Sequence, residues 1–247
     1  GTPQDTSTTL PLEHRVILIT GASRGIGRAV ALAAAKQGAE LIITGRTMGA
    51  LEELDDEISA VGANATIVEL DQTDIEAMPR LAAAIAGRWG RLDGFVANAG
   101  QLGQMAPLAH IDADIFERTI TVNLTSIWHQ IAAFDGLLRQ SDSGRAVLVS
   151  CDSADTSPAY WGAYAVSKAG LDRLASVWAA ETEQTNLKIN LINPGIVGTA
   201  LRASAFPGED KTTIATPDAI AEAFIPLLAA DCPYHGEMLH ASDLLKS

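Results

Sequence analysis

A glycine-rich segment at residues 20–27 constrains the fold of this chain more than any other feature of its sequence. It follows an apolar run at residues 16–19 and opens a stretch in which apolar residues recur at helical spacing: Ile26, Val30, Ala33 and Ala34. Glycine suits a backbone that takes a positive φ or touches a ligand directly, and a helix N-terminus offers unpaired N–H groups to an anion. A strand, a glycine turn and a helix in this order predict a pyrophosphate site. Its glycines, Gly21, Gly25 and Gly27, do not follow the G-x-G-x-x-G spacing.

Strand-like and helix-length segments alternate along the rest of the chain. Several of the strand-like runs are apolar at consecutive positions, as expected for strands that helices cover on both faces. The sequence therefore predicts an α/β fold of the doubly wound Rossmann type, with three α/β/α layers and a mostly parallel, seven-stranded sheet. The expected strands are residues 16–19, 41–44, 66–70, 94–97, 146–150, 188–192 and 238–240.

Length and composition favour one domain. The chain has 247 residues, of which 47% are hydrophobic, so it can bury a large core. We expect a single dinucleotide-binding catalytic domain at residues 14–247, preceded by a disordered leader at residues 1–13. Neither a secretory signal nor a membrane-length apolar run is evident, and a cytoplasmic location is expected.

Charge and metal-ligating residues argue against several classes of function. A net charge of −13 repels nucleic acid and anionic lipid, so an anionic ligand must be held by local groups. The two cysteines, Cys151 and Cys232, form no C-x-x-C pattern, and the histidines show no ligand spacing. We expect no disulfide, no metal site, and neither a nucleic acid nor a membrane as partner.

The glycine loop and several later motifs resemble those of the short-chain dehydrogenases/reductases, in the form found in NADP-dependent bacterial oxidoreductases. The spacing of Gly21, Gly25 and Gly27 is similar to the family's T-G-x-x-x-G-x-G fingerprint. The resemblance covers residues 14–240 and implies that the whole loop contacts the cofactor, including Ser23, Arg24 and Ile26.

The end of the second strand predicts which cofactor is bound. A fold that selects NAD usually places an acid there, on the adenosine ribose 2′-hydroxyl. This chain has Gly45 instead, followed by Arg46, and Arg24 lies in the glycine loop. Two guanidinium forks suit a 2′-phosphate, so we expect NADP rather than NAD. The alternative is that Arg46 is an ordinary surface cation at a helix start.

Later strand ends resemble the rest of the family's cofactor site. Asp71 is similar to the acid that meets the adenine amino group, although Asp71 or Thr73 would also suit the cap of the next helix. The segment Asn98, Ala99 and Gly100 resembles the one beside the adenosine ribose. The resemblance further implies a loop that holds the nicotinamide carboxamide, formed by Pro194, Gly195, Val197 and Thr199.

Tyr164 and Lys168 resemble the family's catalytic Y-x-x-x-K pair. Residues i and i+4 share a helix face, so the ammonium can lie beside the phenol. A cation about 4 Å away is worth roughly 4 kcal/mol at an effective dielectric of about 20, which predicts a lowered pKa for Tyr164. The resemblance implies that Tyr164 is the acid/base, that Lys168 also holds the nicotinamide ribose, and that Asn123 anchors a water leading to the lysine. Tyr160 has no lysine at i+4, so we assign it to a wall or packing role.

Cys151 departs from the family pattern, because it occupies the position of the catalytic serine. That serine donates a hydrogen bond to the carbonyl oxygen as it becomes an alkoxide, and a thiol is a weaker donor. Losing one such donor costs on the order of a hundredfold in rate, which predicts a slow enzyme unless Ser150 or Ser153 takes over. A buried cysteine that is merely tolerated is the remaining alternative.

Together these motifs predict an NADP-dependent short-chain oxidoreductase that interconverts a carbonyl and a secondary alcohol of a small substrate. Residues 200–215 are expected to form a mobile substrate lid. The family usually forms homodimers or homotetramers, and apolar residues after Tyr164 fit such an interface or the core equally well: Ala169, Leu171, Leu174, Val177 and Trp178. The competing hypothesis is an NADP-binding sensor or regulatory protein with weak or no turnover, which Cys151 favours.

Overall fold

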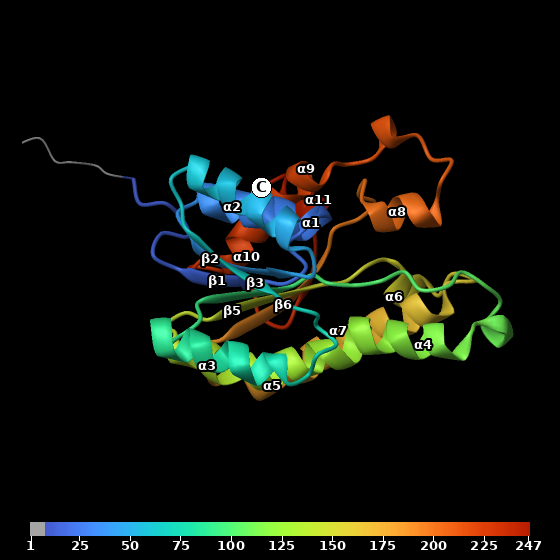
Figure 1. Cartoon of the computed structure of the whole chain (residues 1–247), viewed down its shortest axis with the longest axis horizontal. Coiled ribbons are helices and arrows are strands. Elements are labelled where there is room, and N and C mark those ends of the chain that lie inside the picture. Colours follow the sequence, from blue (N-terminus) through green and yellow to red (C-terminus); the bar gives the residue numbers. More distant parts are fainter. Residues whose placement is uncertain (1–7) are drawn as a thin grey trace, which may run out of the picture.

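The computed structural model describes residues 8–247 and places one sheet between two layers of helices (Figure 1). Seven strands pair in the order β3-β2-β1-β4-β5-β6-β7, and all pairs are parallel. The predicted doubly wound α/β fold is confirmed, and the order reverses between β1 and β4, where such folds bind ligands. The strands are β1 (Val16–Ile19), β2 (Glu40–Gly45), β3 (Ala65–Glu69), β4 (Gly94–Ala97), β5 (Arg145–Val149), β6 (Lys188–Asn193) and β7 (Met238–His240).

The helices divide between the two faces of the sheet. One face is covered by α1 (Gly25–Lys36), α2 (Met48–Ala60), α9 (Pro217–Ala221), α10 (Ile225–Leu228) and α11 (Ala241–Leu244). The other is covered by α3 (Ala77–Trp89), α5 (Ser126–Gln140) and α7 (Gly162–Glu181). In β1, Ile17 and Ile19 pack into the first layer, whereas Val16 and Leu18 pack into the second. Because successive side chains of a strand point to opposite faces, a strand between two helical layers is apolar at every position.

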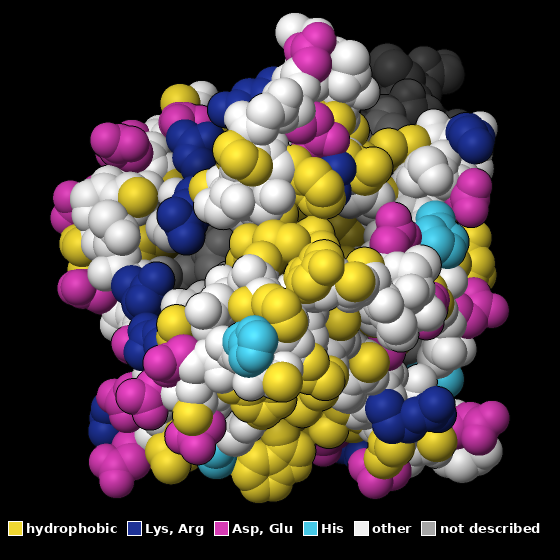
Figure 2. Space-filling model, turned by 90° about the vertical axis from the view of Figure 1, so that its right-hand side faces the viewer, with side chains coloured by type: hydrophobic (Ala, Val, Ile, Leu, Met, Phe, Trp, Pro, Cys, Tyr) yellow, Lys and Arg dark blue, Asp and Glu magenta, His cyan; other side chains and the backbone are white. Residues whose placement is uncertain are grey.

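Three shorter helices project beyond the carboxyl ends of the strands: α4 (Ala113–Ile120), α6 (Ser153–Thr156) and α8 (Ala200–Ala205). A π-helical turn, Thr121–Thr125, joins α4 to α5, and single 3₁₀ turns lie at Leu108–His110, Lys211–Thr213 and Glu222–Phe224. Hydrophobic side chains gather across the middle of this end of the molecule (Figure 2). No helix within residues 8–247 is long and apolar enough to cross a membrane.

The folded part of the chain begins earlier than the sequence predicted. Leu12 is fully buried in the layer that contains Ile17 and α1, and its N–H donates to the carbonyl of Gln37 at 3.0 Å. Ending the leader at residue 13 was therefore wrong, because an apolar side chain at position 12 fills the layer beneath α1. Residues 1–7 of the expected leader lie outside the described part of the chain.

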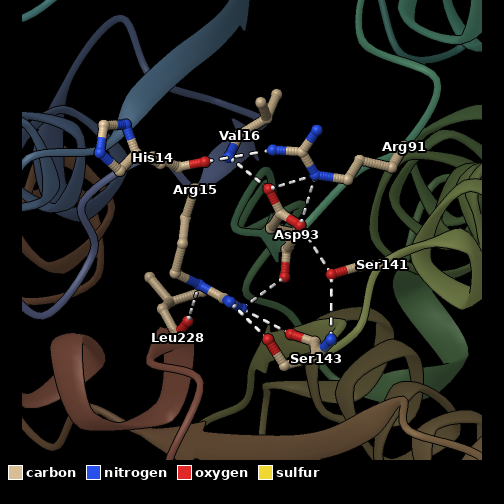
Figure 3. Close-up of polar contacts among 8 residues, drawn as sticks. All are labelled: His14, Arg15, Val16, Arg91, Asp93, Ser141, Ser143 and Leu228. Atoms are coloured by element: carbon tan, nitrogen blue, oxygen red, sulfur yellow. Dashed lines mark hydrogen bonds and ion pairs between the residues drawn. The ribbon is translucent and has the colours of Figure 1, made fainter.

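A buried polar network joins the sheet to its C-terminal helices at the amino ends of β1 and β4 (Figure 3). The carboxylate of Asp93 accepts hydrogen bonds from Val16 N (2.8 Å), Ser141 Oγ (2.6 Å) and Arg91 Nε (3.0 Å). Arg15 donates from Nη2 to the Asp93 carbonyl and from Nε to the Leu228 carbonyl, both at 3.0 Å. The network thus links β1, the start of β4 and α10 at the end of the sheet that lies opposite to α4, α6 and α8.

Candidate active site

A cavity of about 630 Å³ opens beyond the carboxyl ends of strands β1 to β6. Two of the predicted site residues, Gly27 and Asn123, do not line it and are buried. All the others do: Gly21, Ser23, Arg24, Gly25, Ile26, Arg46, Asp71, Asn98, Ala99, Gly100, Cys151, Tyr164, Lys168, Pro194, Gly195, Val197 and Thr199. The fold therefore brings residues from six strand ends into one site.

The glycine loop has the conformation that its spacing predicted. Gly21 and Gly25 have φ values of +62° and +60°, a region that side-chain-bearing residues rarely adopt. A Cβ on Gly27 would come within 2.3 Å of the Gly21 carbonyl oxygen, so α1 packs directly against the loop. Asn98 Nδ2 donates to the same oxygen at 3.2 Å and ties the loop to the end of β4. No side chain caps the N-terminus of α1, whose N–H groups face the cavity end of the sheet.

Gly45 at the end of β2 lies against the glycine loop. A Cβ there would approach the Ser23 side chain to 3.2 Å, so a larger residue would push the loop outward. Arg46 and Arg24 follow as cavity-lining cations. Both arginines therefore line the cavity next to the corner where β2 meets the loop, as expected for a pocket that takes an additional phosphate.

Asp71 lies at the same end of the cavity and is organised by its own turn. Its Oδ1 accepts from Thr73 N at 2.9 Å and from Thr73 Oγ1 at 2.8 Å. These bonds lower the pKa of Asp71, and the nearby charges of Arg46 and Arg118 lower it further. Neither Asp71 nor Thr73 caps α3, which begins at Ala77, so that alternative was wrong. Arg118 of α4 is a third cation of this pocket that sequence reasoning missed, because no motif places α4 beside β3.

Tyr164 and Lys168 are buried on one face of α7. Lys168 Nζ lies 5.8 Å from the centre of the Tyr164 ring and donates to the Val149 carbonyl at 3.0 Å. Burial raises the pKa of Tyr164, and the neighbouring Cys151 raises it further. Burial also lowers the pKa of Lys168. The predicted lowering of the tyrosine pKa was therefore wrong for this arrangement, because burial of the phenol and the neighbouring Cys151 both act in the opposite direction.

Asn123 sits in the π-helical turn and is fully buried. Its Oδ1 accepts from Gln101 N at 2.7 Å, while Nδ2 donates to the Gln101 carbonyl at 2.8 Å and to Ser167 Oγ at 3.0 Å. Ser167 in turn donates to the Tyr164 carbonyl at 2.7 Å. The amide thus connects the loop after β4 to α7. Its role in holding a water stays a prediction.

The three candidates for the oxyanion donor have different surroundings. Cys151 lines the cavity beside Tyr164, and its Sγ lies 2.8 Å from Ser153 Oγ. Ser150 donates instead to Asp172 Oδ1 at 2.5 Å, so its hydroxyl proton is committed elsewhere. Asp172 is a further residue that the sequence analysis missed, although it lies one helical turn after Lys168. The geometry favours Cys151 and Ser153 over Ser150.

The loop after β6 closes the other side of the cavity. Asn193 Oδ1 accepts from Gly195 N at 2.9 Å, and Asn193 Nδ2 donates to Asp152 Oδ1 at 2.5 Å. Thr199 caps α8 by accepting from Arg202 N at 3.2 Å. Thr199 Cγ2 would lie 3.7 Å from a Cβ on Gly25, so this loop faces the glycine loop directly.

Comparison with known proteins agrees with this geometry. A family model described as short chain dehydrogenase matches residues 15–210, which is most of the chain. The chain belongs to the short chain dehydrogenase family.

Individual relatives match over nearly the full chain. The oxidoreductase YciK of Escherichia coli K12 is 36% identical over 223 residues, covering 89% of this chain and 88% of the relative. A solved short chain dehydrogenase from Shigella flexneri 2a, complexed with NADP, is 34% identical with a TM-score of 0.91 and covers 95% of this chain and 99% of that one. Another short chain dehydrogenase structure, from Escherichia coli CFT073 and complexed with NADPH, is 35% identical with a TM-score of 0.90. It covers 97% of this chain and 99% of that one.

This short chain dehydrogenase also has an aromatic wall that sequence reasoning missed. Tyr160, assigned to a wall or packing role, is 61% exposed and does not line the cavity. Trp161 lines it instead, and so does Phe206 after α8. Trp161 could have been found from its position one helical turn before Tyr164. Phe206 offers no such indication, because its contact with Trp161 joins segments that only the folded chain brings together.

Proposed function

We propose that this protein is an NADP-dependent oxidoreductase that interconverts a carbonyl group and a secondary alcohol on a small substrate. One observation carries the proposal: the buried pair Tyr164 and Lys168 lies in the same cavity as a glycine cradle flanked by arginines. The NADP and NADPH complexes of the two solved relatives support the choice of cofactor.

The residues of this chain fit a dinucleotide. The positive φ angles of Gly21 and Gly25 and the open N-terminus of α1 form a cradle for a pyrophosphate. Arg24 and Arg46 would hold the 2′-phosphate, and Asp71 would meet the adenine. Other cavity-lining segments would hold the ribose and carboxamide groups: Asn98, Ala99, Gly100, Pro194, Gly195, Val197 and Thr199. When bound, NADPH supplies the hydride that reduces the carbonyl carbon.

Tyr164 and the side chains around it would supply the proton that the substrate carbonyl oxygen takes up. Because burial raises its pKa, the phenol is protonated at neutral pH and can give its proton to the carbonyl oxygen. The Lys168 ammonium has three N–H donors, of which the Val149 carbonyl accepts one. The other two remain for the phenol oxygen and a ribose hydroxyl. Asn123 would support proton return to the lysine through a water.

Cys151 would stabilise the oxygen charge as it develops. If Ser153 donates to the sulfur, the thiol proton is free to point toward the substrate oxygen. A thiol is a weaker donor than a hydroxyl, so this arrangement predicts slow turnover.

The test is NADPH oxidation, with NADH in parallel, against a panel of aldehydes, ketones and quinones. We expect turnover with a preference for NADPH, and a Cys151→Ser variant that is faster by up to about a hundredfold. Tyr164→Phe should lose turnover by a factor on the order of 10² to 10⁴ while its affinity for NADPH is retained. Saturable NADPH binding without turnover, in both the wild type and Cys151→Ser, would favour the sensor or regulatory hypothesis.

We also propose a homodimer or homotetramer in the cytoplasm. Of the apolar residues expected at an interface, Leu171 and Trp178 pack into the protein's own core, whereas Val177 is exposed on α7, as are Val166 on that helix and Trp128 on α5. The free cysteines Cys151 and Cys232 fit a reducing compartment. Light scattering coupled to gel filtration would measure the assembly.

A further inference from the structure

We propose that the active site takes carbonyl compounds whose non-reacting part is flat and apolar, such as aryl ketones, and that Trp161 and Phe206 select them. This inference rests on the proposed function, because it names the substrate class for the same cavity. It is supported by a row of aromatic contacts, by the pairing of Arg202 with Glu209, and by the backbone conformation before Trp161.

An aromatic stack leads from the catalytic phenol to the segment after α8. The ring centres of Tyr164 and Trp161 are 5.8 Å apart in an edge-on arrangement with planes at 63°. Those of Trp161 and Phe206 are also 5.8 Å apart, with planes at 37°. Both Trp161 and Phe206 line the cavity, together with the apolar side chains of Pro158, Ile196 and Leu201. A planar group attached to a carbonyl at Tyr164 would therefore meet ring edges and faces.

Arg202 and Glu209 hold Phe206 in place. The Arg202 guanidinium lies 3.8 Å from the centre of the Phe206 ring. Its Nε and Nη2 atoms donate to the two carboxylate oxygens of Glu209 at 2.8 and 2.7 Å. One segment thus contains a ring, a cation stacked on it and an acid that neutralises the cation. The Phe206 ring therefore packs against the guanidinium of Arg202 while it lines the cavity.

At this end of the cavity no unpaired cation is left to bind an anionic substrate group. Arg202 is paired with Glu209, and the Asp152 carboxylate, which accepts from the neutral amide of Asn193, would repel an anion. Of the other cations that line the cavity, Lys168 lies beside Tyr164, where it donates to the Val149 carbonyl. Arg46 and Arg118 lie near Asp71, and Arg24 is in the glycine loop. Burying an unpaired charge is costly, so a substrate carboxylate or phosphate would be disfavoured here. An apolar substrate group has no charge to bury and so avoids this cost.

The backbone before α7 is strained in a way that sends Trp161 to the cavity. Ser157 and Tyr160 have φ values of +47° and +74°, in a region that non-glycine residues rarely adopt. The left-handed turn leaves the Tyr160 side chain 61% exposed while the next residue, Trp161, lines the cavity. Strain of this kind persists where the surroundings enforce it, as expected for a segment that positions a selecting residue. Figure 2 shows hydrophobic side chains across this end of the molecule.

The test compares two ketones of nearly equal size, acetophenone and cyclohexyl methyl ketone, which differ in whether the ring is flat. The measured quantity is the ratio of their kcat/KM values, in the wild type and in Trp161→Leu, Phe206→Leu and the control Tyr160→Leu. Intrinsic reactivity cancels when ratios of variants are compared. We expect each cavity variant to lower the ratio by roughly two- to tenfold and the control to leave it unchanged.

A second measurement does not require turnover. Saturation-transfer NMR on the protein saturated with NADP⁺ reports which protons of each ketone contact it. We expect strong transfer to the ring protons of acetophenone, reduced in both cavity variants but not in Tyr160→Leu. Phe206 is 39% exposed, so its variant keeps the test valid should Trp161→Leu fold poorly.

The outcomes separate this inference from the proposed function. An unchanged ratio in both cavity variants, or equal transfer to the two ketones, would overturn the substrate class even if the enzyme turns over. If NADPH binds but no carbonyl is reduced, the proposed function fails, and the NMR measurement alone then supports or overturns the aromatic site.

Discussion

Replacing Asp93 by alanine should destabilise the protein strongly without touching the active site. The carboxylate of Asp93 accepts from Val16 N and Ser141 Oγ, both buried, and its negative charge acts on the buried guanidinium of Arg15. A buried donor that loses its partner costs about 1–3 kcal/mol. Two such donors lose their acceptor here, which amounts to about 2–6 kcal/mol. The ion pair with Arg91 adds at most about 1 kcal/mol, because the Arg91 side chain is 40% exposed. We therefore expect Asp93→Ala to lower the free energy of unfolding by about 3–5 kcal/mol.

Urea unfolding followed by circular dichroism measures this loss directly. At about 2–4 °C per kcal/mol for a domain of this size, the melting temperature should fall by about 6–20 °C. The affinity for NADPH should be unchanged, because Asp93 lies at the amino ends of the strands. Asp74→Ala is the matched control: Asp74 pairs with Arg80 at 3.4 Å, both side chains are largely exposed, and the expected loss is at most about 1 kcal/mol. A loss for Asp93→Ala no larger than this control would refute the reasoning.

Two further predictions concern the active site. The carboxylate of Asp172 raises the pKa of Lys168 against the effect of burial, and Cys151 acts in the same direction. Asp172→Asn should lower the lysine pKa further, so the ammonium is lost at a lower pH and the alkaline limb of the kcat/KM profile moves to lower pH; an unmoved limb would contradict this. Gly27→Ala places a Cβ 2.3 Å from the Gly21 oxygen and should weaken NADPH binding by at least about tenfold in a fluorescence titration. Gly87→Ala in α3, where a Cβ meets nothing within 4 Å, is the control and should leave the affinity unchanged.

Much of the candidate site could be predicted from the sequence because its parts are local motifs placed by topology. Gly21, Gly25 and Gly27 serve a single turn, and Tyr164 and Lys168 share a helix face whatever the rest of the chain does. Parallel strands end at one edge of a sheet, so motifs that follow successive strands meet there. The order of the strands was enough to bring them into one cavity.

Properties that depend on long-range packing could not be predicted. The pKa of Tyr164 is raised because the phenol is desolvated, and desolvation depends on every element packed around it. Ser150 is committed to Asp172, twenty-two residues further along the chain, which no local pattern indicates. The sequence placed Leu12 in a leader, because its burial against Ile17 and α1 is visible only in the folded structure.

The sequence by itself determined the fold class, the conformation of the glycine loop and the shared helix face of Tyr164 and Lys168, because each follows from backbone geometry or from residues within one or two turns of each other. The tertiary structure alone decided which groups surround that chemistry. It placed Trp161 and Phe206 along one wall and paired Arg202 with Glu209. It also directed the Ser150 hydroxyl to Asp172, which leaves Cys151 and Ser153 as the candidate oxyanion donors. Such contacts join segments distant in the chain, and their energies exist only once the layers have packed.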